Sequence, residues 1–125
     1  MMLKQVLIVE DSESCAETLQ IALESIPGLE TRIMNSPRAA IVALRESQGE
    51  IAAVVTDLHL PQSDGFDLIR QLRAEPRFAR LPILLISGDS DPLLAEKALA
   101  QGADAFFPKP YSPSAVRKKL EQLLC

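Results

Sequence analysis

The chain has 125 residues, 47% of them hydrophobic and 24% charged, which is typical of one globular domain that folds around its own core without disulfides or a structural metal. Thirteen basic and seventeen acidic residues give a net charge of −4, with no basic stripe, so direct nucleic-acid binding is disfavoured and a cation is the expected ligand. No apolar run has the length of a membrane span and no targeting signal is visible, so we expect a cytoplasmic protein without membrane contact.

The alternation of segment types along the chain indicates the fold class. Five apolar segments, at 5–10, 29–34, 51–57, 82–87 and 103–107, alternate with segments of helical period. The third and fourth ("IAAVVT" and "PILLIS") are continuous apolar runs, as expected of central parallel strands, whereas "LETRIM" alternates and resembles an edge strand. This order predicts an α/β fold with an open parallel sheet between two helix layers in a single domain over 1–125.

Helix starts and core faces are also visible. Ser36-Pro37, Asp91-Pro92 and Ser112-Pro113 each pair a capping side chain with a proline at the first helical position. Apolar stripes at helical spacing are expected to be core: Leu19, Ala22, Leu23, Ile26, Ile69, Leu72, Val116, Leu120, Leu123 and Leu124. Cys15 lies on the first of these helices and is interpreted as a small buried side chain, because neither it nor Cys125 has zinc-ligand spacing.

Chemically useful side chains follow the expected strands, at the edge of the sheet where ligands bind in such folds. Glu10 and Asp11 follow the first strand, Asp57 ends the third, Ser87 ends the fourth and Lys109 follows the fifth. Because carboxylates packed together repel one another, a divalent cation is expected between the three acids. Oxygen ligands suit Mg²⁺, with Mn²⁺ as an alternative ion.

This set of residues is suited to phosphoryl transfer. Asp57 is the central carboxylate and therefore the candidate nucleophile towards phosphorus, with the metal and Lys109 supplying positive charge. The Ser87 hydroxyl would donate to a phosphoryl oxygen on Asp57 and have less to hold when that carboxylate is bare. A contact made in only one state is the basis of a switch.

Four motifs, "VLIVEDSES", "VVTDLHLPQSDGFDLIRQLR", "PILLISGDSD" and "GADAFFPKP", resemble the receiver domain of two-component response regulators in order and spacing over nearly the whole chain. The resemblance implies a flavodoxin-like (βα)5 fold with strand order 2-1-3-4-5. It implies that Asp57 accepts a phosphoryl group from a histidine kinase or phosphotransfer protein and slowly loses it by self-hydrolysis. It therefore implies a signalling protein that is not a turnover enzyme.

The resemblance also implies roles for individual residues. Glu10, Asp11 and Asp57 would bind the metal together with the backbone carbonyl of His59, and Ser87 and Lys109 would bind the phosphoryl group. His59 and Asp89 would tune the lifetime of the phosphorylated state, Ser87 and Phe106 would switch together, and the Lys109–Pro110 peptide would be cis.

The resemblance implies an output face formed by the fourth helix, fifth strand and fifth helix, which would contact an effector domain or a downstream protein, and it allows a homodimer. Phe106 and Phe107 should point to opposite sides of the last strand, one in the core and one partly exposed, and the resemblance assigns exposure to Phe106. Leu94, Ala98 and Tyr111 flank it, either as part of a partner surface or as core.

Three other functions remain open from the residues alone. A Mg²⁺-dependent phosphohydrolase also uses an aspartyl nucleophile, but usually has a second acid where this chain has His59. An interaction module could keep the fold without the chemistry, although all the reacting residue types are present. A flavin site is least favoured, because the loop "EDSES" is acidic where a flavin phosphate needs neutral donors.

Overall fold

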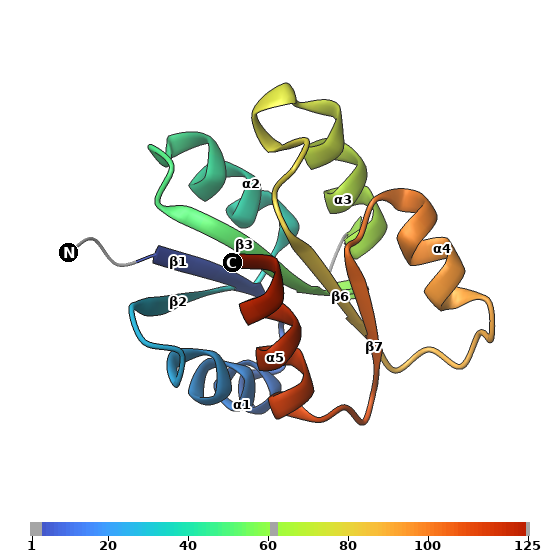
Figure 1. Cartoon of the computed structure of the whole chain (residues 1–125). Coiled ribbons are helices and arrows are strands. Elements are labelled where there is room, and N and C mark those ends of the chain that lie inside the picture. The colour runs from blue at the N-terminus through green and yellow to red at the C-terminus, as the bar shows by residue number, and fades with distance from the viewer. Residues whose placement is uncertain (1–3, 61–62, 125) are drawn as a thin grey trace.

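The computed structural model describes residues 4–60 and 63–124. Its main sheet has five strands, β1 (Lys4–Val9), β2 (Leu29–Met34), β3 (Ile51–Asp57), β6 (Ile83–Ser87) and β7 (Ala105–Pro108) (Figure 1). Every neighbouring pair is parallel and the order is β2-β1-β3-β6-β7. Numbered along the chain, this is the order 2-1-3-4-5, so the predicted flavodoxin-like fold is confirmed.

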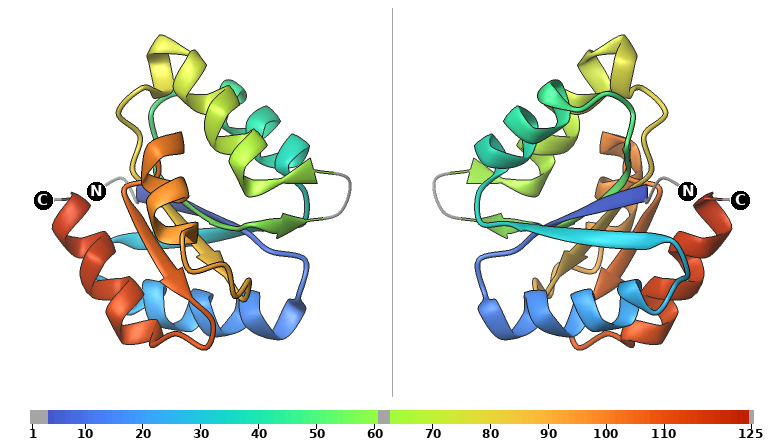
Figure 2. Two further views of the ribbon diagram at one scale, coloured as in Figure 1. Left: turned by 90° about the vertical axis from the view of Figure 1, so that its right-hand side faces the viewer. Right: turned by 90° about the vertical axis from the view of Figure 1, so that its left-hand side faces the viewer.

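Helices cover both faces of this sheet (Figure 2). On one face α1 (Glu13–Glu24) lies beside α5 (Pro113–Leu124), and on the other lie α2 (Pro37–Glu46), α3 (Gly65–Ala74) and α4 (Leu94–Gln101). A short 3-10 helix, η1 (Pro76–Phe78), follows α3. In the part of the chain that the structure describes, no helix is long and apolar enough to cross a membrane.

The central strands are buried on both sides, which explains their continuous apolar sequences. Val6 and Ile8 of β1 pack under α1 and α5, whereas Leu7 and Val9 pack under α2 and α3, and all four are fully buried. The same alternation continues along β3 and β6. The expected double-sided burial is therefore confirmed, and the sheet is a rigid support for the residues at its edge.

Two of the three predicted helix starts are confirmed. The Ser36 hydroxyl accepts the N–H of Ala39 at the start of α2, and that of Ser112 accepts the N–H of Ala115 at the start of α5. The third predicted start, Asp91-Pro92, was placed too early, because α4 begins at Leu94 and not at Pro92. There the Asp91 side chain accepts the N–H of Leu93 in a tight turn and also binds Lys97 Nζ at 2.7 Å.

Other boundaries differ by one or two residues. β1 ends at Val9, before Glu10, and β6 begins at Ile83. β7 begins at Ala105 instead of residue 103, because the N–H of Ala103 bonds back to Ala98 and completes the end of α4. A small antiparallel hairpin, β4 (His59–Leu60) and β5 (Ser63–Asp64), was not predicted. Pro61 lies outside the described residues.

Several predicted environments also need correction. Cys15 is half-buried at a surface cavity instead of lying in the core. Phe106 and Phe107 do face opposite core clusters, but both are half-buried, so neither is fully core. Leu94 and Ala98 are almost completely buried, so these two residues belong to the core and not to a partner surface.

Gly65 brings α3 against the end of β3. Its N–H donates to the carbonyl of Leu58 at 2.7 Å. A Cβ at this position would lie only 2.6 Å from the carbonyl oxygen of Asp57 and 2.9 Å from Cδ1 of Leu85. The first turn of α3 therefore packs directly on the backbone that carries Asp57, and only glycine fits there.

Candidate functional site

Three carboxylates meet at the carboxyl edge of the sheet. Glu10 and Asp11 follow β1, Asp57 ends β3, and one oxygen atom from each lies within 4.8 Å of the other two. Glu10 and Asp57 are buried, with 4% and 7% of their surface exposed, while Asp11 is exposed. The structure thus brings together the three acids that the sequence analysis selected, in an arrangement of hard oxygen donors open on one side.

Lys109 places its ammonium group against these acids. Its Nζ donates to Oδ2 of Asp57 at 3.1 Å and lies 3.6 Å from Oε2 of Glu10. Its backbone N–H donates to the carbonyl of Ser87 at 2.8 Å, which fixes the loop after β7 to the end of β6, and the Lys109–Pro110 peptide is cis. The cation is therefore held by its main chain as well as by its charge.

The electrostatics show an excess of negative charge. Burial raises the pKa of Glu10, and the neighbouring Asp57 adds to this, against the opposing effects of the Ser12 N–H and Lys109. Burial opposes the charge of Lys109, but its hydrogen bond to Asp57 and both carboxylate charges outweigh this and raise its pKa. Since one ammonium faces three carboxylates, an additional cation at this edge would be favourable.

Ser87 lies at the same edge and is fully buried. Its hydroxyl accepts the N–H of Asp89 at 3.0 Å, and among the described residues it makes no hydrogen bond to Asp57. Phe106 lies on the adjacent strand, paired in register with Leu85. The hydroxyl is therefore near the acids but engaged elsewhere.

His59 and Asp89 form a contact that the sequence analysis did not foresee. Nε2 of His59 lies 3.2 Å from Oδ2 of Asp89, and both side chains are exposed. The contact joins β4 to the loop after β6. Both residues had been selected, but their pairing depends on the adjacency of two strands 30 residues apart in sequence.

Two other features of the site were not predicted from the sequence. The N–H of Ser12 donates to Oε1 of Glu10 at 3.0 Å and so fixes that carboxylate in the turn before α1. A surface cavity of about 470 Å³ adjoins the site, lined by Cys15 and Thr18 on one side and by Lys109, Pro110 and Tyr111 on the other. An acid three residues before the start of α1 was the only sequence signal for the first, and nothing in the sequence signalled the second.

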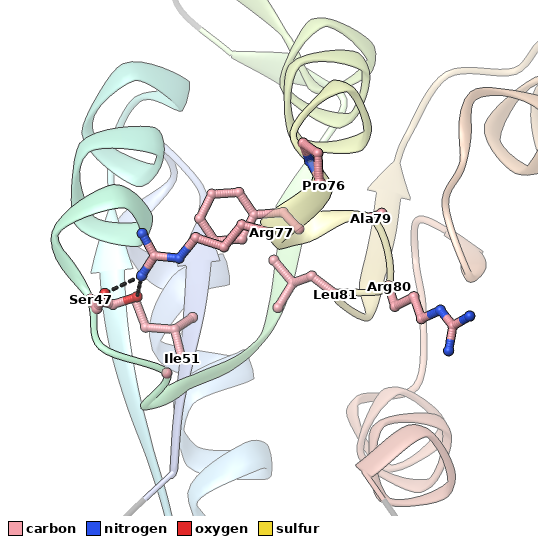
Figure 3. A pocket seen from close by; sticks show the side chains of 9 residues that line it. Ser47, Ile51, Pro76, Arg77, Ala79, Arg80 and Leu81 are labelled. Carbon is pink, nitrogen blue, oxygen red and sulfur yellow. Dashed lines mark hydrogen bonds between the residues drawn. The ribbon is translucent and has the colours of Figure 1, made fainter.

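Another cavity, of about 410 Å³, lies beside η1 and the start of β3, away from the acids (Figure 3). There the Arg77 guanidinium donates to the carbonyl and hydroxyl oxygens of Ser47 and to the carbonyl of Arg45. These bonds satisfy carbonyl groups at the end of α2, so Arg77 has a structural role. Arg80 points away from them (Figure 3), and none of the described residues that line this cavity is acidic.

The family model described as "response regulator receiver domain" matches residues 6–121. The chain belongs to the response regulator receiver family. Receiver domains are signalling modules of two-component systems and not classical enzymes, and this chain has their fold, with the acids at the sheet edge.

Curated relatives of this receiver domain fall into two lengths. It is 31% identical over 121 residues to the transcriptional regulatory protein GltR of Pseudomonas aeruginosa, covering 97% of this chain and 49% of GltR. It is 33% identical over 112 residues to the DNA-binding response regulator MtrA of Mycobacterium tuberculosis, covering 90% and 46%. The chain therefore spans about half the length of these relatives. The chemotaxis protein CheY1 of Helicobacter pylori, 25% identical, is matched over 96% of both chains.

Solved structures agree with the fold. A putative response regulator from Chloroflexus aurantiacus superimposes with a TM-score of 0.88 at 27% identity, over 98% of both chains. A response regulator receiver protein from Pseudomonas putida gives a TM-score of 0.85 at 29% identity, also over 98% of both chains.

Proposed function

We propose that this receiver domain accepts a phosphoryl group on Asp57 from a histidine kinase or phosphotransfer protein and changes conformation as a result. The observation that carries the proposal is the contact of Lys109 with Asp57 inside the cluster of three acids. Asp57 sits on a rigid buried strand, so its carboxylate is presented in a fixed position, and positioning with positive charge is what phosphoryl transfer requires.

The metal of this proposal is Mg²⁺, with Mn²⁺ as an alternative. Glu10, Asp11 and Asp57 would hold it by their side chains and His59 by its backbone carbonyl, and the oxygen-only donor set fits a hard cation. A bound cation would neutralise charge on the phosphoryl oxygens. An oxygen of Asp57 forms the new bond to phosphorus while the bond from phosphorus to the donor imidazole breaks, and the imidazole nitrogen keeps that electron pair.

The other residues of the site would act on the product. Lys109 is placed to remain beside the phosphoryl group as a point charge, since it already contacts Oδ2 of Asp57. The Ser87 hydroxyl would leave the N–H of Asp89 and donate to a phosphoryl oxygen, and Phe106 would follow by packing because it has no hydroxyl. His59 and Asp89 would set the lifetime of the phosphorylated state by controlling access of water.

The output would pass through the face formed by α4, β7 and α5, where Leu93, just before α4, and Leu99 of α4 are about half exposed. The partner that binds this face would be an effector region of the same polypeptide or a separate protein, since the relatives include both long regulators and a chain of this length. We place the protein in the cytoplasm with no direct nucleic-acid contact by this domain.

Incubation with Mg²⁺ and acetyl phosphate tests the proposal, with intact-mass spectrometry as the readout, and beryllofluoride gives a stable mimic for ¹⁹F NMR. We expect one adduct on the wild type, none on Asp57→Asn, and an undiminished adduct on the control Asp67→Asn, whose carboxylate is exposed on α3. No adduct on the wild type, or an equal one on Asp57→Asn, would refute the proposal. Steady turnover of a phosphate monoester would instead indicate a phosphohydrolase.

A further inference from the structure

The outward side of α1 carries an acidic stripe, which we define as Glu17, Ile21 and Glu24. These residues have the spacing i, i+4, i+7 and therefore lie along one side of the helix. Ile21 is 76% exposed, the highest value among the large hydrophobic side chains that are exposed in the described chain. The helix contains a further acid, Glu13, and no basic residue.

The outward side of α2 carries an arginine stripe, which we define as Arg38, Val42 and Arg45. It has the same spacing, i, i+4, i+7, and Val42 is 46% exposed. The stripe borders a cavity of about 430 Å³ that is closed on its other side by Ser63 and Gln71. An apolar side chain would therefore find a recess between two arginines.

The two stripes are complementary. Each places its two charges seven residues apart, which is about 10.5 Å along a helix, with one aliphatic residue between them. One stripe has two acids and the other has two arginines. Whether the helices run parallel or antiparallel, an acid meets an arginine at both ends, and Ile21 lies opposite Val42 and the cavity beside it.

The stripes of one molecule do not meet, because α1 and α2 cover opposite faces of the sheet (Figure 2). We propose that the acidic stripe of one copy of this chain binds the arginine stripe of a second copy. This goes beyond the proposed phosphoryl transfer and is independent of it, since neither stripe includes a residue of the acid cluster.

Two of the four charges are already engaged within the molecule. Glu24 accepts hydrogen bonds from the N–H and hydroxyl of Thr31, and Arg45 pairs with Glu75. Among residues 4–60 and 63–124, Glu17 and Arg38 have neither a side-chain hydrogen bond nor an ion pair. Their charges are free for a partner, and substituting them leaves the folded chain's own contacts intact.

Each stripe has three residues, far fewer than the roughly 20–30 residues a side of a standard interface. We therefore expect weak, concentration-dependent association that declines with salt, since the Debye length falls from about 10 Å at 0.1 M to about 3 Å at 1 M ionic strength.

Reciprocal charge reversal tests the proposal. Glu17→Arg and Arg38→Glu should each weaken self-association about tenfold in sedimentation equilibrium, because like charges then face each other. An equimolar mixture of the two variants should restore the association, because the unaltered acidic stripe of the Arg38→Glu chain then meets the unaltered arginine stripe of the Glu17→Arg chain, in either helix orientation. Ile21→Ser should weaken association without changing its dependence on salt.

Glu96→Arg on α4 and Lys118→Glu on α5 are matched controls, since they make the same changes in net charge at other exposed helix positions. They should leave the association unchanged. A wild-type chain that stays monomeric up to about 1 mM, the weak end of the usual affinity range, would overturn the proposal. So would a mixture that does not restore association, or controls that weaken it as much as the stripe variants, which would place the contact on α4 and α5.

Discussion

Replacement of Gly65 by alanine tests how closely α3 is packed on the strand that carries Asp57. The added Cβ would lie 2.6 Å from the carbonyl oxygen of Asp57 and 3.1 Å from Cα of Leu58, whereas ordinary contacts begin at about 3.4 Å. Both neighbours are backbone atoms, and the third, Cδ1 of Leu85, belongs to a fully buried side chain. No neighbour is free to move, so the helix must shift away from the strand.

The size of the effect follows from two opposing contributions. Overpacking in a well-packed region destabilises by about 1–3 kcal/mol. Alanine is a better helix former than glycine by about 1 kcal/mol in a helix interior, and this applies only in part at the first residue of α3. Taking about half of that preference off the overpacking cost, we expect Gly65→Ala to lower the free energy of unfolding by roughly 0.5–2.5 kcal/mol.

Urea denaturation followed by circular dichroism measures this change, with an unchanged slope as evidence that the two-state comparison is valid. Gly88→Ala is the matched control, because the nearest atom to its new Cβ is Cβ of Lys109 at 3.7 Å, an ordinary contact distance. We expect the control to change stability by less than about 0.5 kcal/mol. A Gly65→Ala protein as stable as the wild type would show that the close approach of α3 to β3 is wrong.

Two other predictions concern stability and pH. Arg73 donates to the carbonyls of Gly102 and Phe78, so Arg73→Ala should lower the free energy of unfolding by about 2–3 kcal/mol in the same urea assay. The control Arg70→Ala, at an exposed position, should lower it by less than about 1 kcal/mol, and equal losses would contradict the prediction. Burial raises the pKa of Glu10, so the folded state binds this proton more tightly than the unfolded state, and stability falls as the pH rises from 4.5 through the raised pKa. In metal-free buffer, Glu10→Gln should therefore stabilise the protein at pH 7 and lose that advantage near pH 4.5; a gain that is the same at both pH values would rule this out.

The sheet could be predicted because its signals are local and strong. A continuous apolar run such as "IAAVVT" is compatible with few environments other than a strand covered on both faces. The convergence of Glu10, Asp11 and Asp57 was predictable for a related reason, since strand ends in a parallel sheet share one edge.

The errors arise where one group has several possible partners. Asp91 next to Pro92 is a good helix start by sequence, but its carboxylate also binds Lys97, and the turn that satisfies both delays α4 to Leu94. The contact of His59 with Asp89 depends on which strands are neighbours, which no local pattern contains. The exposure of Cys15 depends on how closely the loop around Tyr111 approaches α1.

The hydrogen bond from the N–H of Asp89 to the Ser87 hydroxyl bears on the output of the unphosphorylated domain. In the proposed switch, that bond must break before the hydroxyl turns towards Asp57. A net value of about 0.5–1.5 kcal/mol for one hydrogen bond corresponds to a roughly two- to twelvefold bias between conformations. In that switch, such a small bias would let the unphosphorylated domain visit its active form often enough to give a basal output, and phosphorylation would act by enlarging that fraction.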